Sequence, residues 1–273
     1  MANIDQLLAI MDRLRDPQRG CPWDRQQTHA SLVPYLLEEA YETAETIEQQ
    51  DWDHLPDELG DLLFQIVFHA RLGKEAGRFD FDTVVTRICD KLVRRHPHVF
   101  ADTRFDSIAE QTADWEARKQ AEREAKAGGR TGVLEGVSTA LPALTRAEKL
   151  QRRAARVGFD WPEAHGVLDK IREETDELAT EMAQGGSRER LAGEVGDLLF
   201  SVVNLARHLG VDAESALREA NRRFERRFAA METRLAERGG ITAADPAAMD
   251  AAWEAVKRGE REDAQPEDAN EHE

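Results

Sequence analysis

The sequence predicts an all-α protein built from tandem duplicated domains of the four-helix-bundle type. Apolar residues recur at helical spacing over most of the chain, whereas sustained period-2 alternation and Val/Ile/Thr-rich runs bounded by turns are absent. Residues 60–72 recur as residues 196–208, with eight of thirteen positions identical at an offset of 136. This period is too long for a solenoid repeat, so it indicates two domains of one fold.

The helical spacing places the elements in order along both halves. We expect helices near residues 4–15, 29–50, 54–77, 81–95 and 107–127, and then near residues 142–157, 163–184, 187–209, 213–238 and 245–259. Pro34 falls inside the second of these ranges and indicates either the true start of that helix or a kink. Asp53 with Pro56, and Asp245 with Pro246, are typical of helix starts.

Composition and the repeat together predict the domain boundaries. An N-terminal helical domain takes residues 1–127, a linker takes residues 128–141, and a C-terminal helical domain takes residues 142–262. The glycines at the start of the linker are typical of a flexible connection. Residues 263–273 are acidic and poor in apolar side chains, so we expect a disordered tail that folding and catalysis do not need.

Net charge and cysteine usage limit the classes of partner and compartment. The formal charge is −17, of which residues 260–273 contribute −6 through seven acids and one arginine, leaving −11 on the body. This balance goes against binding of nucleic acid through its phosphate backbone. No apolar run is long enough to span a membrane. Cys21 and Cys89 form no metal or redox motif, so we expect reduced thiols in a cytoplasmic protein.

Two acidic clusters occur at almost the same spacing in the two halves. The first acidic cluster is Glu39, Glu42, Glu58 and Asp61, and the second acidic cluster is Glu174, Glu177, Glu194 and Asp197. Acids three residues apart share one helix face. In a helical hairpin, the two pairs of a cluster lie symmetrically about residue 50 or about Gly185-Gly186. All four carboxylates therefore lie at one level, roughly 12 Å from the hairpin tip at about 1.5 Å per residue.

Facing carboxylates repel one another unless a cation neutralises them. Each cluster therefore predicts a site for a hard divalent cation, Mg²⁺, with Mn²⁺ as a substitute ion. A single Glu-x-x-Glu pair is more often a solvated helix face, but here the arrangement occurs twice and borders an apolar stripe. The stripe, which we expect to be buried, consists of Leu59, Leu62, Leu63, Ile66, Val67 and Ala70.

A basic stripe follows each acidic cluster. Its members are Lys91, Arg94 and Arg95 in the first half, and Arg222, Arg223, Arg226 and Arg227 in the second. Asn221 precedes the second stripe, where the first half has Cys89. Guanidinium groups suit phosphate oxygens, and the alternative is a surface row of salt bridges.

Each half ends with a tryptophan four residues before a lysine, Trp115/Lys119 and Trp253/Lys257. The tryptophan either stacks on a nucleobase, with the lysine on a phosphate, or packs on the bundle. His96-Pro97-His98 is expected to form an extended turn of ordinary loop histidines, because the residue before proline avoids the α region.

Taken together, three motifs resemble the MazG family of nucleoside triphosphate pyrophosphohydrolases. They are Gly20-Cys21-Pro22-Trp23-Asp24, the two acidic clusters with their Gly-Asp-Leu-Leu-Phe continuation, and Arg95-His96-Pro97-His98-Val99-Phe100. The resemblance runs from about residue 4 to about residue 257. It implies an all-α enzyme that works as a homodimer and uses Mg²⁺ to convert a nucleoside triphosphate to the monophosphate and pyrophosphate.

The resemblance also assigns roles to residues. The eight carboxylates of the two acidic clusters become metal ligands. The nucleotide contacts become Asn221, Arg223, Arg227, Trp253 and Lys257 in the second half and Lys91, Arg95, Trp115 and Lys119 in the first. Cys89 departs from the pattern, so we expect the second half to carry more of the activity.

Hydrolysis between the α- and β-phosphates needs a water nucleophile and stabilisation of negative charge, which fits these residue types. Glu38 and Glu173 precede the ligands in both halves and are candidates for the base; the choice between them and the other outer carboxylates stays open. Two other classes are kept as alternatives. A di-iron carboxylate bundle would need Glu-x-x-His motifs, which these helices lack, and a non-catalytic helical scaffold would need no metal.

Overall fold

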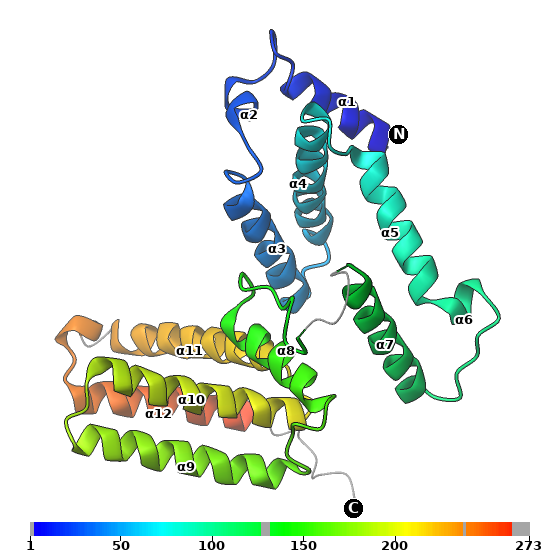
Figure 1. Ribbon diagram of the computed structural model, residues 1–273. Helices are drawn as coiled ribbons and strands as arrows, with labels where there is room; N and C mark the ends of the chain where they lie inside the picture. Colours follow the sequence, from blue (N-terminus) through cyan, green and yellow to red (C-terminus); the bar gives the residue numbers. More distant parts are fainter. Residues whose placement is uncertain (1–2, 127–131, 237–238, 264–273) are drawn as a thin grey trace, which may run out of the picture. The chain divides into compact units, whose positions relative to one another are not determined.

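In the computed structural model, residues 3–126, 132–236 and 239–263 are described, and their regular secondary structure is entirely helical (Figure 1). This confirms the all-α prediction. The expected tail beyond residue 263 and the glycines at 128–129 lie outside the described residues. No helix in the described part of the chain is long and apolar enough to cross a membrane.

The chain divides into two compact units, residues 1–122 and 123–273. The helices that begin in the first are α1 (Ile4–Leu14), α2 (Pro22–Gln26), α3 (Val33–Glu48), α4 (Leu55–Glu75), α5 (Phe81–Arg95), α6 (Pro97–Phe100) and α7 (Ile108–Lys126). Those of the second are α8 (Ala143–Ala155), α9 (Ala164–Ala183), α10 (Arg188–His208), α11 (Ala213–Ala236), the 3₁₀ turn η1 (Ile241–Ala243) and α12 (Pro246–Asp263).

The ten expected helices are all present, and three short elements were not expected. These are α2, α6 and η1, whose three to five residues are too few to show a helical period. The extended turn expected at His96-Pro97-His98 is wrong after its first residue, because Pro97 begins α6, where a proline at the first helical position costs no hydrogen bond.

The helix-start signals are correct at three prolines, Pro34, Pro56 and Pro246, and wrong at one acid, Asp53. Pro34 marks a true start, since α3 begins at Val33. Asp245 accepts a hydrogen bond from the amide of Ala248 at 2.7 Å and so caps α12. Asp53 does not cap α4. The residue before that helix is His54, whose amide and ring both contact Asp51.

The core of the first unit lies where α1 packs across α4 next to the start of α3. It consists of Met11, Leu32, Val67, Phe68 and Leu72. The loop between α1 and α3 is tied to this core by polar contacts. Arg15 donates to both carboxylate oxygens of Glu75, at 2.8 and 2.6 Å, and to the backbone carbonyl of Asp24.

The second unit has two packed regions. In one, α9, α10 and α8 lie together; Val167 and Val203 are buried, and the Gln151 side chain donates to the carbonyl of Phe200 at 2.8 Å. In the other, α11 and α12 form a hairpin around Met231, Leu235 and Val256.

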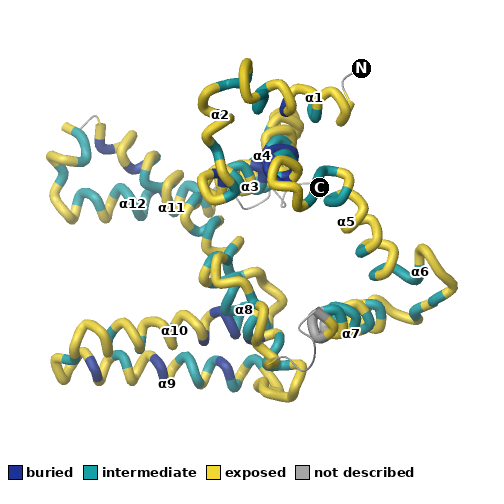
Figure 2. The backbone as a smooth tube through the Cα atoms, turned by 45° about the horizontal axis from the view of Figure 1, so that its top comes forward, coloured by how far each residue is buried: buried dark blue, intermediate teal, exposed yellow. Residues whose placement is uncertain are grey.

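The expectation that the whole apolar stripe of α4 is buried is wrong. Val67 and Ala70 are buried, but Leu59, Leu63 and Ile66 are 48, 38 and 40% exposed. Figure 2 shows many exposed residues along the paired helices α9 and α10, and a buried stretch on α4. The spacing identifies an apolar helix face correctly, but among the described residues none buries its end nearest the tip.

Candidate metal and phosphate site

Two helical hairpins carry the acidic clusters: the first hairpin is α3–α4 and the second hairpin is α9–α10 (Figure 1). Their tips fall where the symmetry of the acids predicts. Gln50 has φ +58° and Gly185 has φ +68°, one residue after the C-cap of α3 and of α9. A left-handed residue at this position ends a helix and reverses the chain, so both hairpins fold with the acids in register.

The first hairpin brings three of its four predicted ligands together. Ligand oxygens of Glu39, Glu58 and Asp61 lie within 4.8 Å of one another, and Glu42 does not join this group. Burial, followed by the charges of neighbouring carboxylates, raises the pKa of Glu39 above its ordinary value. Three carboxylate oxygens at this spacing fit a hard divalent cation.

The second hairpin repeats the arrangement with one added cation. Glu174, Glu194 and Asp197 offer oxygens within 4.8 Å of one another, again without the fourth acid, Glu177. The ammonium of Lys170 lies 2.8 Å from a carboxylate oxygen of buried Glu174 and 2.8 Å from one of Glu173. These two hydrogen bonds raise the pKa of Lys170, so the lysine is charged at neutral pH.

Cations bracket the second acidic cluster on both sides, and the sequence reasoning missed both. Lys170 lies four residues before Glu174, on the side away from the tip. On the tip side, Arg190 pairs with Glu181 at 2.5 Å. The only signal in the sequence was their position, because each lies one helical turn from a predicted ligand.

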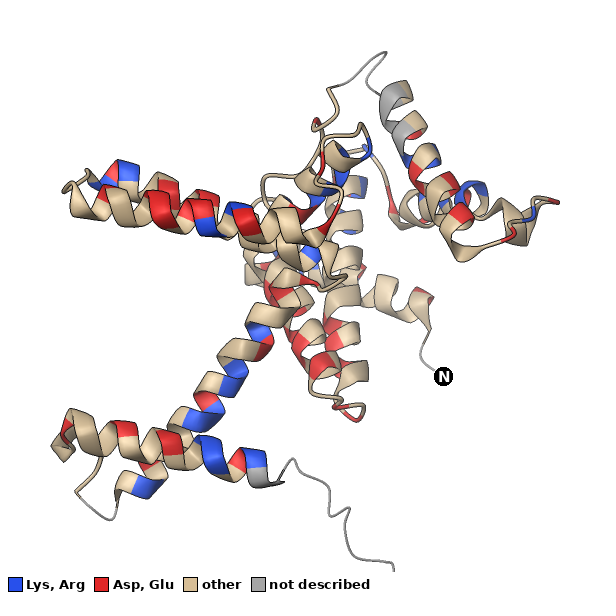
Figure 3. Cartoon of the chain, turned by 90° about the horizontal axis from the view of Figure 1, so that it is seen from below, with Lys and Arg blue, Asp and Glu red and all other residues tan. Residues whose placement is uncertain are grey.

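The second hairpin also has an open groove of about 720 Å³. Among the residues that line it are Glu173, Glu177, Glu181, Arg190 and Glu194. The groove therefore reaches from two members of the second acidic cluster, Glu177 and Glu194, to the Glu181–Arg190 pair, whereas Glu174 and Asp197 do not line it. Figure 3 shows how densely charged residues follow one another on the helical hairpins.

Two of the three members of the first basic stripe are paired within the described chain. Arg94 and Arg95 donate to the two carboxylate oxygens of Glu122, at 2.9 and 2.6 Å. These contacts, led by the Arg95 hydrogen bond, lower the pKa of Glu122 to about 2. Lys91 lies on the same helix, α5, and makes no side-chain hydrogen bond or ion pair among the described residues.

Three of the four members of the second basic stripe are also paired. Arg227 donates to Glu260 of α12 at 2.7 Å, and this hydrogen bond lowers the pKa of Glu260. Arg222 and Arg226 contact Glu219 on their own helix. Arg223 and Asn221 are exposed, and within the described chain neither side chain makes a hydrogen bond.

The two tryptophans have different surroundings. Trp115 is 37% exposed, meets the ring of His96 edge-on and has the ammonium of Lys119 5.9 Å from its centre. Trp253 packs against the core of α11 and α12 and lies 5.4 Å from the ring of Phe224. Lys257 pairs with Glu254 at 2.7 Å. The packing alternative therefore describes Trp253 in this chain, and Trp115 keeps an accessible ring.

Within the described residues, the structure does not bring the basic stripes or the tryptophans into contact with the acidic clusters. The ion pair of Glu174 involves Lys170, not an arginine of α11. Of the two candidate bases, Glu38 is exposed without an ion pair in the described chain, and Glu173 is hydrogen-bonded to Lys170. The site roles assigned by resemblance stay predictions.

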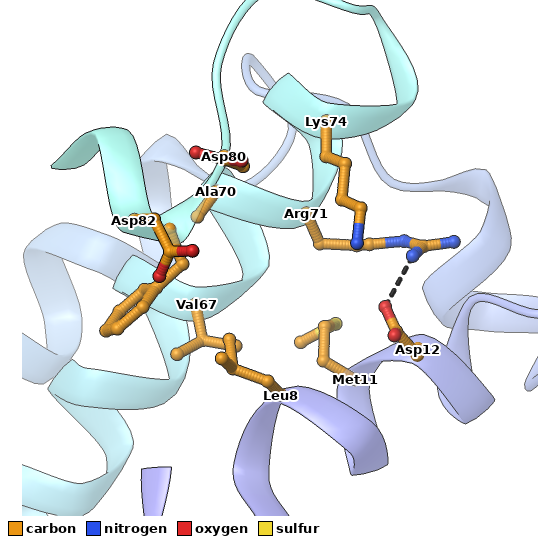
Figure 4. Close-up of a pocket in the computed structure, with 10 residues that line it drawn as sticks. Leu8, Met11, Asp12, Val67, Ala70, Arg71, Lys74, Asp80 and Asp82 are labelled. Atoms are coloured by element: carbon orange, nitrogen blue, oxygen red, sulfur yellow. Dashed lines mark hydrogen bonds and ion pairs between the residues drawn. The ribbon is translucent and has the colours of Figure 1, made fainter. Parts of the chain in front are cut away.

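A separate hollow of about 110 Å³ lies between α1, α4 and the start of α5 (Figure 4). Leu8, Met11 and Val67 form its apolar wall, and at its edge Arg71 pairs with Asp12. No residue of the first acidic cluster lines it. The hollow is therefore distinct from the candidate metal site.

These features define a class: a duplicated helical protein in which paired helices present carboxylates suited to a divalent cation. The MazG nucleotide pyrophosphohydrolase domain matches residues 27–100 and 163–230, and so covers the hairpins of both halves. The chain belongs to this family, a family of hydrolases.

Full-length relatives agree with the family. A nucleoside triphosphate pyrophosphohydrolase of Escherichia coli strain K12 is 51% identical over 262 residues, which cover 95% of this chain and 99% of that protein. A nucleoside triphosphate pyrophosphohydrolase/pyrophosphatase MazG of Thermotoga maritima is 43% identical, covering 94% of this chain and 96% of that protein. The scaffold and di-iron alternatives find no support in these matches.

Proposed function

We propose that the chain hydrolyses ribo- and deoxyribonucleoside triphosphates to the monophosphate and pyrophosphate, with Mg²⁺ as cofactor. The observation that carries this proposal is the second acidic cluster, three convergent carboxylates with Lys170 on one side and Arg190 on the other. Carboxylates suit the cation, and flanking cations suit the oxygens of a polyphosphate chain. The names of the relatives support the substrate class.

The residues that would hold Mg²⁺ are Glu174, Glu194 and Asp197, with Glu177 one turn toward the tip. When bound, the ion supplies electrostatic stabilisation of the phosphate oxygens and makes a water molecule more acidic. Lys170 orients Glu174 through a 2.8 Å contact and adds positive charge beside the cluster.

Proton removal from the attacking water falls to a carboxylate at the edge of the cluster. Glu173 is the candidate in the second half and Glu38 the candidate in the first. Glu173 lines the groove, and its hydrogen bond to Lys170 holds the carboxylate beside Glu174. A carboxylate fixed within reach of the reacting water is the arrangement that general-base catalysis needs.

The second half is the more active half in this proposal. Tyr35 occupies the position that corresponds to Lys170, so the first acidic cluster lacks the neighbouring ammonium. The two basic stripes do not differ in this way, since each keeps one cation without an ion pair in the described chain, Lys91 in the first and Arg223 in the second. The difference lies at the carboxylates, where a polyphosphate chain meets the Lys170 ammonium in the second half and no cation at the matching position in the first.

A homodimer would supply what one chain lacks. The exposed residues Leu59, Leu63 and Ile66 leave an apolar face next to the first acidic cluster, and Leu199 and Phe200 do the same beside the second. A second copy covering these faces could also bring Arg223 or Arg227 to the carboxylates. Light scattering tests this: the account requires twice the 30.8 kDa chain mass, and a monomer in dilute solution contradicts it.

The biological role we propose is house-cleaning or control of the nucleotide pool in the cytoplasm, a compartment that the two free cysteines favour. Analysis of products by ion-exchange chromatography tests the reaction. We expect monophosphate and pyrophosphate in Mg²⁺ and neither in EDTA. A diphosphate with orthophosphate would refute cleavage between the α- and β-phosphates, and full activity in EDTA would refute the cofactor.

A further inference from the structure

In each hairpin, we call two residues at equal distances from the tip, one on either helix, a rung. The Glu181–Arg190 pair is the rung of the second hairpin that follows the acidic cluster toward the tip. Residues 174 and 197, 177 and 194, and 181 and 190 all have the same midpoint, 185.5. The first two rungs hold predicted metal ligands. The third joins α9 to α10 through Arg190 Nη2 and Glu181 Oε2 at 2.5 Å, so it fixes an arginine one helical turn from Glu177 and Glu194.

The two partners differ sharply in burial. The side chain of Glu181 is 7% exposed and that of Arg190 is 66% exposed. The other carboxylate oxygen of Glu181, Oε1, is buried without a hydrogen-bond partner in the described structure. Burying a carboxylate is costly, and a partner whose guanidinium stays in water repays little of that cost. The pair is therefore expected to contribute little to the folding stability of the hairpin, so stability does not account for its presence.

The hairpin tip leaves room for the Glu181 carboxylate. A Cβ atom at Gly186 would lie 1.9 Å from Glu181 Oε1, so only glycine leaves the carboxylate in place. The tip and the ion pair are thus fitted to each other. Arg190 and Glu181 both line the groove, together with Glu177 and Glu194 of the second acidic cluster.

The first hairpin has no such pair. Its corresponding rung is Thr46 and His54, whose positions share the midpoint 50 with the first acidic cluster. Thr46 bonds to the carbonyl of Glu42 on its own helix, and His54 contacts Asp51 at the tip. The fixed arginine is therefore specific to the half that we propose to be more active.

We propose that Glu181 is a positioning residue: it holds Arg190 so that the remaining guanidinium N–H groups face the phosphate oxygens of a nucleotide at the second acidic cluster. The inference rests on the proposed function. A guanidinium offers five donors, of which Glu181 occupies part. Anchoring one side of it lowers the entropy lost when the other side binds phosphate.

The test measures both catalysis and binding in the full-length protein. Glu181→Gln keeps the shape of the side chain and removes its charge. We expect KM for a nucleoside triphosphate, and Kd for a non-hydrolysable analogue in Mg²⁺, to rise about tenfold, or about 1.4 kcal/mol. We expect kcat to change less than twofold. Asp176→Asn is the matched control, because Asp176 lines the same groove without an ion pair in the described chain; its KM should stay within twofold.

A double-mutant cycle separates positioning from a general charge effect. If Glu181 acts through Arg190, adding Glu181→Gln to Arg190→Gln leaves Kd unchanged, whereas independent effects would multiply. Gly186→Ala offers a second route, since the added Cβ displaces the carboxylate while both partners remain; it should raise Kd as Glu181→Gln does. Melting temperatures identify any variant that fails to fold, and the remaining variants still decide the question.

The outcomes separate the two proposals. An active wild-type enzyme whose KM and Kd are unaffected by Glu181→Gln, or are lowered by it, overturns the positioning role alone. Multiplying effects of Glu181→Gln and Arg190→Gln overturn it as well. A wild-type protein that releases no pyrophosphate from any nucleoside triphosphate overturns the proposed function and this inference with it.

Discussion

Replacing Asp61 by Asn should stabilise the protein in the absence of metal and weaken the stabilisation by Mg²⁺. Each pair of the three convergent carboxylates lies within 4.8 Å, so a pair repels by at least about 0.9 kcal/mol at the dielectric constant of water. Asp61 takes part in two of these three pairs. Because Asp61 is exposed, the water value applies, and the change removes about 2 kcal/mol of repulsion before screening by salt.

Scanning calorimetry in EDTA and in Mg²⁺ measures both effects. In EDTA we expect the first unit of Asp61→Asn to melt about 5 °C above wild type. In Mg²⁺ the difference should shrink or reverse, because the wild type gains more from the cation. Asp197→Asn is the comparison in the second half, where Lys170 already offsets part of the repulsion, so its gain in EDTA should be smaller. An Asp61→Asn protein that melts at or below wild type in EDTA would refute the reasoning.

Three further predictions concern contacts outside the acidic clusters. Arg15→Ala should destabilise the first unit by about 3 kcal/mol in urea unfolding. The reason is that the Arg15 side chain, 8% exposed, binds the Glu75 carboxylate and the backbone carbonyls of Asp24 and Gln27. A loss below about 1 kcal/mol would contradict this. The Arg95 hydrogen bond lowers the pKa of Glu122 from 4.5 to about 2, so the pair's contribution of about 1 kcal/mol to the free energy of unfolding is complete above pH 4.5 and is lost as pH falls through 2. Glu122→Gln should therefore flatten the dependence of stability on pH over that window. An unchanged acid unfolding profile would show that the pair contributes nothing. Gln50→Gly should raise stability by about 0.5–1 kcal/mol, because Gln50 has φ +58°, and a decrease would mean that its side chain stabilises the tip.

The hairpin register could be predicted from the sequence because it follows from positions alone. Acids three residues apart share a face, and equal distances from a turn place them opposite one another, as Glu39, Glu58 and Asp61 show. The fourth acid of each cluster was grouped with the others by the same rule, yet it does not converge with them. Periodicity assigns a helix face; it does not determine where a flexible side chain ends.

Contacts between distant segments could not be predicted. Arg95 was expected to face phosphate, but it pairs with Glu122, which lies 27 residues further on in a different helix. The exposure of part of the apolar stripe of α4, including Leu63, was not predicted for the same reason. An apolar face is visible in the sequence, whereas what covers it depends on tertiary or quaternary packing.

The most direct test of the account is the turnover of Asp197→Asn beside that of Asp61→Asn, each measured as pyrophosphate released from nucleoside triphosphates in Mg²⁺, with circular dichroism as the folding control. We predict that Asp197→Asn lowers kcat/KM at least about a hundredfold, or about 2.7 kcal/mol, and that Asp61→Asn leaves more of the activity. Loss of activity in Asp61→Asn alone would contradict the assignment of the second half. Full activity in both folded variants would show that the acidic hairpins are not the active site.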